Sequence, residues 1–294
     1  MTDPSSSAES TDHNGRADSL VELLNLRRLD DDRFEGDSPT PGPQRVFGGQ
    51  VAAQALIAAG RTVDPTRAVH SLHGYFVRAG DSSEPIEYRV ENIRDGRSFS
   101  VRRCVAMQRG KPIFTMAASF QRTEHGLDHQ RPAPEGVPGP DEVLGAWDHL
   151  LPADERRRWP WPLDLRYVTP PGWFKPGERP RGDFQRVWMR ITGTLPDDPL
   201  LHACALTFAS DMTLLDAILS VHGEVWGPGG MVGASLDHAL WFHRPFRADE
   251  WFLYDCASPS ASGARGLATG QMYTQDGRNI ATAVQEGLLR RVGA

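Results

Sequence analysis

Apolar and polar side chains alternate with a period of two over much of the chain. The pattern is clearest in residues 98–108 and 112–121, which are separated by the short Arg109-Gly110-Lys111 segment. It predicts two antiparallel strands joined by a hairpin. The same reading predicts strands at residues 33–35, 70–78, 85–94, 162–168, 185–194, 234–244, 251–257, 263–274 and 279–290. The last two are joined by Gln275-Asp276-Gly277-Arg278, whose Asp-Gly pair is a strong hairpin signal.

Three other stretches follow a helical period. A capping-box pattern at Ser19-Leu20-Val21-Glu22 predicts a short amphipathic helix, and residues 49–60 predict a helix of small residues that ends at Gly60. Residues 210–223 predict a third helix, capped by Ser210 and ended by Gly223. This helix is apolar on most of its surface, so we expect a curved sheet to wrap it. Asp211 is expected in its first turn, where free N–H groups favour a carboxylate or a bound anion.

The two halves of the chain repeat one plan of helix, strand, strand and hairpin. Ser71-Leu72-His73 aligns with Ser235-Leu236-Asp237, and Gly110-Lys111-Pro112-Ile113 aligns with Gly277-Arg278-Asn279-Ile280. This alignment places Asp211 opposite Gly48 and Gln285 opposite Ala118 in the other copy. Only the second half has polar side chains at these places, so we expect one functional site per chain.

Composition divides the chain into four parts. Residues 1–18 are polar and predict a disordered tail, residues 19–125 form the first half, residues 126–160 are a Pro- and Gly-rich linker, and residues 161–294 form the second half. A short helix is expected near residues 141–150. The tail lacks the apolar core of a secretory signal, and no apolar run approaches the length of a membrane span. These features predict a cytoplasmic protein.

Charge and cysteine content exclude several classes of function. The 294 residues include 32 Lys and Arg against 38 Asp and Glu, and this formal net charge of -6 argues against a nucleic-acid partner. The three cysteines Cys104, Cys204 and Cys256 are far apart, which predicts buried thiols rather than disulfides or a zinc site. We expect neither a metal nor a cofactor.

Three polar residues of the second half are the candidate catalytic group. In a sheet wrapped around a helix, Asp211, Ser235 and Gln285 fall where the helix start, the following strand and the last strand meet. A carboxylate, a hydroxyl and an amide could hold a water molecule, with Asp211 drawing off its proton as it attacks a carbonyl carbon. Main-chain N–H groups near the helix start are candidates to hold the oxyanion. Such chemistry suits a thioester. Taken singly, the three residues are a helix cap, a locally bonded hydroxyl and an exposed strand residue.

Several other polar residues are expected to have structural roles. His238 and His243 flank an aromatic strand and are expected to pack or to bond to backbone, whereas Asp216 and Glu224 are expected to face solvent. The segment Gly227-Pro228-Gly229-Gly230 lacks the setting of a phosphate loop and predicts a turn beside the site. The absence of G-x-S-x-G and H-E-x-x-H motifs disfavours a serine hydrolase and a zinc protease.

The sequence resembles the acyl-CoA thioesterase II, or TesB-like, family. The resemblance runs from about Ser19 to the C-terminus and rests on these segments: VFGGQVAAQAL (46–56), RDGRSFSVRR (94–103), GKPIFTMAASFQ (110–121), ASLDHALWFHRPF (234–246), SGARG (262–266) and YTQDGRNIATAVQEGLLR (273–290). It implies an α+β double hotdog, two repeats each with a long helix wrapped by a curved antiparallel sheet.

The resemblance also implies a site and a substrate. The water-activating Asp, Thr or Ser, and Gln of the family fall on Asp211, Ser235 and Gln285. Acyl-CoA would be the substrate, with CoA at the surface and the acyl chain in a tunnel beside Asp211. By analogy the protein is a homo-oligomer, a dimer or tetramer. The following arginines are possible phosphate partners: Arg102, Arg103, Arg244 and Arg265.

Two alternative functions stay open at this point. A hotdog hydratase or dehydratase acting on an enoyl- or hydroxyacyl-CoA needs a paired acid and base, for which His238 is the only nearby partner of Asp211. A non-catalytic acyl-CoA sensor or carrier would keep the fold and lose turnover.

Overall fold

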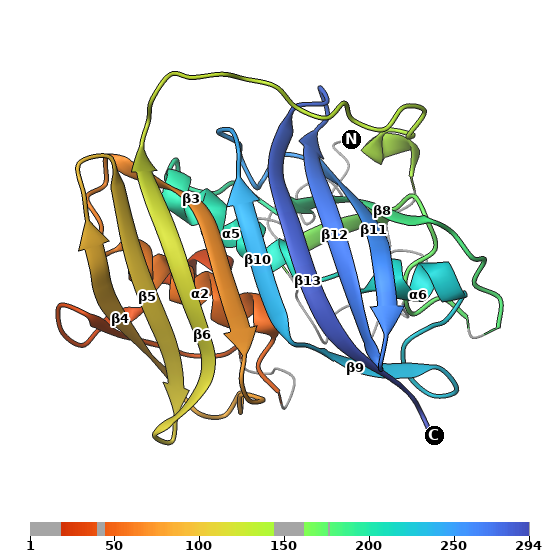
Figure 1. The fold of residues 1–294 in the computed structure, drawn as a ribbon, viewed down its shortest axis with the longest axis horizontal. Coiled ribbons are helices and arrows are strands. Elements are labelled where there is room, and N and C mark those ends of the chain that lie inside the picture. The colour runs from red at the N-terminus through yellow and green to blue at the C-terminus, as the bar shows by residue number, and fades with distance from the viewer. Residues whose placement is uncertain (1–18, 40–44, 144–161, 176, 294) are drawn as a thin grey trace, which may run out of the picture.

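A computed structural model describes residues 19–39, 45–143, 162–175 and 177–293. One long antiparallel sheet carries the helices on one face (Figure 1). Its thirteen strands within these ranges are β1 (Arg27–Arg28), β2 (Arg33–Gly36), β3 (Arg67–Phe76), β4 (Ile86–Asp95), β5 (Phe99–Gln108), β6 (Lys111–Arg122), β7 (Leu163–Tyr167), β8 (Phe184–Ile191), β9 (Met231–Ser235), β10 (Asp237–Phe242), β11 (Phe252–Ser262), β12 (Arg265–Thr274) and β13 (Asn279–Arg291).

The order of the strands shows the repeat that the sequence predicts. It runs β1-β2-β4-β5-β6-β3-β10-β13-β12-β11-β8-β7, with β9 pairing to β13 off this path. Outward from the central β3–β10 pair, β6, β5 and β4 on one side correspond to β13, β12 and β11 on the other. The two halves join where His73 pairs with Ala239. The boundaries of the halves, at residues 125 and 161, stay a prediction.

Most predicted strands lie within a few residues of their predicted limits. The β5–β6 hairpin turns through Arg109 and Gly110, whose φ angles of 48° and 72° suit the tight turns that antiparallel strands favour. The predicted strand at 234–244 is instead two strands, β9 and β10. The Asp237 carboxylate accepts a hydrogen bond from Glu286 N at 2.7 Å, which replaces a main-chain pairing at the break.

Two helices pack against each other under the centre of the sheet. Helix α2 (Gly48–Gly60) is buried along almost its whole length, as its alanine-rich sequence predicts. Helix α5 (Pro199–Ser210) runs antiparallel to it: a Cβ on Gly49 would lie 2.5 Å from the Phe208 carbonyl oxygen, and a Cβ on Gly60 would lie 2.5 Å from Leu200. Glycine at both ends of α2 therefore permits this close approach.

The predicted helix over residues 210–223 is wrong in its position. Helix α5 begins earlier, because Asp198 accepts a hydrogen bond from Leu200 N at 2.9 Å and Pro199 takes the first helical position. It ends at Ser210, whose carbonyl oxygen accepts a hydrogen bond from the Tyr254 hydroxyl at 3.1 Å. The chain then turns, and a separate short helix, α6 (Asp216–His222), ends at Gly223 in the left-handed conformation. Asp211 is thus the C-cap of α5 and not part of a first turn.

The segment after β6 crosses from the first half of the sheet to the second (Figure 1). Gln130 donates to the Gly277 carbonyl at 2.8 Å, and the Trp188 indole donates to the Pro138 carbonyl at 2.8 Å. The predicted helix near residues 141–150 is only a short 3₁₀ turn (Pro140–Glu142) in the described part, and residues 144–150 lie outside it, as does the predicted tail at 1–18. No helix among the described residues is long and apolar enough to cross a membrane.

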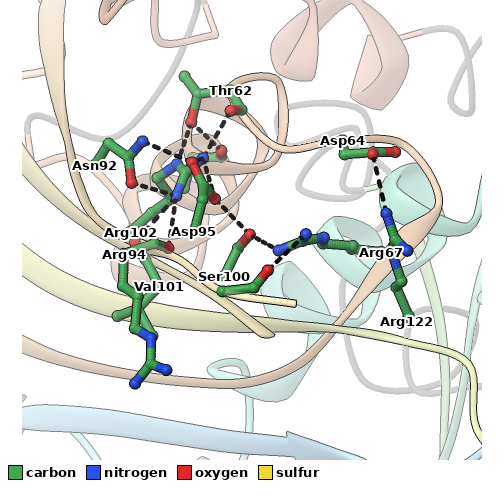
Figure 2. A network of polar contacts seen from close by, with 12 residues as sticks. Thr62, Asp64, Arg67, Asn92, Arg94, Asp95, Ser100, Val101, Arg102 and Arg122 are labelled. Carbon is green, nitrogen blue, oxygen red and sulfur yellow. Dashed lines mark hydrogen bonds and ion pairs between the residues drawn. The ribbon is translucent and has the colours of Figure 1, made fainter. Parts of the chain in front are cut away.

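A buried arginine ties the end of α2 to the sheet (Figure 2). The Arg102 side chain is only 3% exposed, and its guanidinium donates to the Thr62 hydroxyl and carbonyl, both at 2.9 Å, to Asn92 at 2.8 Å and to Asp95 at 3.1 Å. All of these partners are within the protein, so the suggestion that Arg102 binds phosphate is wrong. Its role is to hold the turn after α2 against the β4–β5 hairpin.

Replacing this arginine should destabilise the fold without touching the candidate site. We expect Arg102→Met to lower the free energy of unfolding by about 3 kcal/mol, because several charge-assisted hydrogen bonds are lost. Its neighbour Arg103 is the matched control, since its side chain is 58% exposed and lies 3.6 Å from the Glu91 carboxylate. Arg103→Met should cost less than about 1 kcal/mol. Equal losses in urea unfolding of the two variants would contradict this assignment.

Candidate active site

Asp211 lies at the junction of the two halves and receives hydrogen bonds from both. Gln285 Nε2 donates to Asp211 Oδ1 at 2.5 Å, and Ser235 Oγ donates to the same oxygen at 3.4 Å. The main-chain N–H of Gly49 also donates to this carboxylate. The structure therefore brings Asp211, Ser235 and Gln285 together, as the sequence predicts, and adds a donor from the first half.

The helix start that faces Asp211 belongs to α2. A Cβ on Gly48, the first residue of α2, would lie 2.6 Å from Asp211 Oδ2. Helix α2 has no acidic residue in its own first turn. Asp211 therefore supplies the negative charge that the N-terminus of a helix favours. The sequence therefore correctly predicts that Asp211 lies at a helix N-terminus, but this helix is α2 and not the predicted helix over residues 210–223.

The positions of Ser235 and Gln285 follow from the sheet. Ser235 is the last residue of β9 and pairs with Gly287 of β13. Gln285 is fully buried on the helix-facing side of β13, between the small residues Ala283 and Gly287. Gln285 is therefore not an exposed strand residue. Its Oε1 has no hydrogen-bond partner within the described part of the chain, which leaves an acceptor beside Asp211.

A cleft of about 200 Å³ opens beside these groups. Its lining residues are Asp211, Met212, Leu215, Asp216, Trp226, Gly233, Ala234 and Ser235. Asp211, Asp216 and Ser235 contribute polar groups to this lining, and Met212, Leu215 and Trp226 contribute apolar side chains. The volume is below the roughly 300–1,000 Å³ that is typical of small-molecule sites, so only a small part of a large ligand fits inside.

Burial makes Asp211 an effective base at neutral pH. It raises the pKa of the Asp211 carboxyl to about 6, against the opposing effect of the hydrogen bonds from Gln285, Gly49 and Ser235. A carboxyl with this pKa is ionised at pH 7 but binds a proton far more readily than an ordinary aspartate does. The arrangement can therefore hold a water molecule and accept its proton.

His238 has a supporting position behind the site. Its Nε2 lies 2.7 Å from the Ser210 hydroxyl, and its ring is completely buried. Burial lowers the pKa of His238 to about 3, so the imidazole is neutral. It does not line the cleft. The expectation of a packing histidine fits this position, and the acid-base pair that a hydratase needs does not form in the cleft.

Sequence reasoning missed three contributors to the site. Gly48 is predicted only as the counterpart of Asp211 in the other copy, and Gly49 only as the start of a helix. Asp216 was expected to face solvent, but it is 5% exposed and lines the cleft. A glycine pair at a helix start was the available signal for the first two, since it permits close approach of another group.

The other arginines considered for phosphate binding lie in ion pairs. Arg244 pairs with Asp128, and Arg265 pairs with Glu286 at 3.0 Å. In the part of the chain that the structure describes, no group of three or more His, Cys, Asp or Glu side chains could hold a metal ion.

Comparison with known proteins identifies the family. A family model described as "Acyl-CoA thioesterase" matches residues 163–288, and one described as "Acyl-CoA thioesterase N-terminal domain" matches residues 35–121. Human acyl-coenzyme A thioesterase 8 is 40% identical over 293 residues, which cover 92% of this chain and 88% of the human protein. The chain belongs to the acyl-CoA thioesterase family.

Other acyl-CoA thioesterases are similar over almost their whole length. Acyl-CoA thioesterase 2 from Haemophilus influenzae is 38% identical over 282 residues, covering 92% of this chain and 96% of that protein. The solved structure of an acyl-CoA thioesterase II, TesB2, from Mycobacterium marinum is 41% identical with a TM-score of 0.76, covering 94% of this chain and 98% of that one. A protein with a hotdog fold from Alicyclobacillus acidocaldarius, 19% identical, has a TM-score of 0.75, which shows the fold alone. The predicted double hotdog is confirmed.

Proposed function

We propose that this thioesterase hydrolyses acyl-CoA by direct attack of a water molecule that Asp211 activates. The observation that carries the proposal is the convergence of Gln285, Ser235 and the Gly49 N–H on one half-buried carboxylate that lines a cleft. Family membership supports the reaction, and the geometry supports the roles of the residues.

The water would be held between acceptors on two residues. Asp211 would accept one of its protons, and Oε1 of Gln285, which has no hydrogen-bond partner among the described residues, would accept the other. Gln285 Nε2 is committed to Asp211, which fixes the orientation of the amide because a carboxylate can only accept. Ser235 adds a donor that keeps the carboxylate in place.

The reaction then balances without any further group. The water oxygen attacks the thioester carbonyl carbon while Asp211 takes a proton, and a tetrahedral oxyanion forms. N–H groups in the first turn of α2, which have no acceptor within the helix, are candidates to stabilise this oxyanion. The oxyanion collapses, the C–S bond breaks, and Asp211 returns the proton to the CoA thiolate. The products are a free fatty acid and CoA.

The reaction is tested by free-thiol release from a panel of acyl-CoAs with the whole chain. We expect thiol to appear with at least one chain length at turnover typical of enzymes, in the range of about 1 to 1,000 per second. Tight binding of acyl-CoA without thiol release would instead indicate a sensor or carrier, and would contradict the proposal.

The pH dependence of the rate tests the role of Asp211. Because the pKa of its carboxyl is about 6 and the ionised form is the base, kcat/KM should rise with pH, reach half its maximum near pH 6 and level off above pH 7. The measurement is an initial-rate profile of thiol release between pH 4.5 and 8.5, roughly spanning that titration. A rate that is independent of pH across this range would exclude Asp211 as the base.

The assembly and the compartment belong to the proposal as well. We propose a cytoplasmic homo-oligomer, a dimer or tetramer, because hotdog proteins commonly associate through their sheets. Light scattering coupled to size-exclusion chromatography would report the mass, and a monomer at micromolar concentration would contradict this part.

A further inference from the structure

Asp216 and Trp226 form one hydrogen-bonded wall of the cleft. Asp216, the first residue of α6, is 5% exposed, and each of its carboxylate oxygens has a partner. Trp226 Nε1 donates to Oδ1 at 2.6 Å, and Gly172 N donates to Oδ2 at 2.9 Å. The main-chain N–H of Trp226 donates to the Gly172 carbonyl at 2.7 Å. Asp216, Gly172 and Trp226 therefore form a closed ring of hydrogen bonds.

This ring fixes the Trp226 indole against β9. A Cβ on Gly233 would lie 2.9 Å from Trp226 Cζ3, so the indole lies close against the strand that ends at Ser235. A Cβ on Gly172 would lie 2.3 Å from Asp216 Oδ1, so only glycine fits in the ring. Held at its N–H, at its main chain and along its ring, Trp226 has little freedom to swing out of the cleft.

The cleft offers an acyl chain several apolar side chains near the catalytic residues. A thioester carbonyl beside Asp211 and Ser235 shares the cleft with the apolar side chains of Met212, Leu215 and Trp226. The CoA part is much too large for a cleft of about 200 Å³, so the acyl part is the portion of the substrate that enters it. The acyl chain therefore extends toward Trp226.

We propose that Trp226, held in place by Asp216, closes the acyl end of the cleft and limits this enzyme to acyl-CoAs of short to medium chain length. The inference rests on the proposed function. It makes Trp226 a specificity-determining residue and Asp216 a positioning residue that acts through it.

The test compares chain-length profiles of whole-chain variants. The values of kcat/KM for butyryl-, octanoyl- and palmitoyl-CoA are measured for the wild type, Trp226→Ala and Asp216→Asn. In Trp226→Ala the ratio of palmitoyl to butyryl activity should rise tenfold or more, since one extra methylene in an apolar pocket is worth roughly 10- to 200-fold. Asp216→Asn should shift the ratio in the same direction but less, because an amide offers one acceptor oxygen where the carboxylate offers two.

Two further variants keep the outcome interpretable. Trp241 lies on β10 and lines another hollow of the surface, so Trp241→Ala is the control and should leave the ratio unchanged. Trp226→Phe removes only the N–H and part of the ring. If Trp226→Ala does not fold, Trp226→Phe is measured in its place. A small rise in the palmitoyl-to-butyryl ratio of kcat/KM in Trp226→Phe would support the proposal that Trp226 limits chain length.

The outcomes separate this inference from the function on which it rests. If the wild type releases no thiol from any acyl-CoA, the proposed function fails. If the wild type is active but Trp226→Ala lowers kcat/KM by one common factor at every chain length, the function stands and the wall is wrong. A uniform rise in KM with unchanged kcat would place Trp226 on the CoA side and would also overturn the inference.

Discussion

Replacing Asp211 with Asn or Ala should lower kcat for acyl-CoA hydrolysis by about 10²- to 10⁴-fold, the usual contribution of a general base. Neither side chain can take a proton from water at neutral pH, while Ser235 and Gln285 are unchanged. The KM should change much less, because the cleft walls formed by Leu215 and Trp226 are untouched. The measurement is thiol release under saturating substrate. Activity within a factor of about ten of the wild type would remove Asp211 from the mechanism.

The Asp211→Asn variant should also be more stable than the wild type at neutral pH. A carboxyl whose folded pKa is raised to about 6 favours folding below its ordinary pKa of 3.8, and this contribution is lost as the pH rises through 6. Above pH 6 the wild type therefore holds an unfavourable buried charge that Asp211→Asn lacks. We expect the variant to gain roughly 1–3 kcal/mol at pH 8 and little at pH 4. A loss of stability in urea unfolding at pH 8 would contradict the pKa assignment.

Gly48→Ala should cost about a hundredfold in kcat although it adds a single methyl group. The new Cβ would lie 2.6 Å from Asp211 Oδ2 and 2.9 Å from Phe76, so the carboxylate must move. A displacement of about 1 Å in a catalytic group is enough for such a loss. Thiol release at saturating substrate measures the effect.

The fold of this variant should survive, which separates catalysis from stability. Alanine is a better helix former than glycine at the start of α2 by up to about 1 kcal/mol, and this gain offsets part of the contact strain. The control is Gly126→Ala, where a Cβ meets no atom within 4 Å and neither activity nor stability should change. If Gly48→Ala kept full activity, α2 would not be a wall of the site.

The sheet could be predicted because one of its faces is buried and the other is not. Alternation in β6 marks its inward side chains, and the Asp276-Gly277 pair marks the final hairpin. In β5 the alternation predicts the strand but not its inner face, because Phe99 is exposed while Ser100 and Arg102 are buried. In β13 every second residue from Ala281 to Leu289 is buried. The same parity places Gln285 on the inner face. A chain duplicated along its length then gives the symmetric strand order, since each half repeats the same local pairings.

The break between α5 and α6 could not be predicted from local pattern. The periodicity of residues 210–223 is compatible with one helix, but α5 ends because Tyr254 takes the Ser210 carbonyl and His238 contacts the Ser210 hydroxyl. Both partners lie on strands far along the chain. The contact of Asp211 with Gly49 is likewise tertiary, because it depends on the antiparallel packing of α2 and α5.

The burial of Asp216 could not be predicted from the local sequence either. A single aspartate at the start of a short helix is usually solvated. The residues next to it in the sequence do not predict which groups will donate hydrogen bonds to it. Those partners, Gly172 and Trp226, come from segments on either side of α5 and α6. Only the assembled fold brings them to one carboxylate.

The central claim is that water attacks the thioester directly while Asp211 acts only as a base. The most direct test is a single turnover in ¹⁸O-labelled water with the enzyme in excess over acyl-CoA, followed by mass spectrometry of both the fatty acid and the peptide that contains Asp211. Direct attack predicts one ¹⁸O atom in the fatty acid and none in Asp211. Label in the Asp211 carboxylate would show that this side chain attacked the thioester to form an anhydride, and would contradict the account.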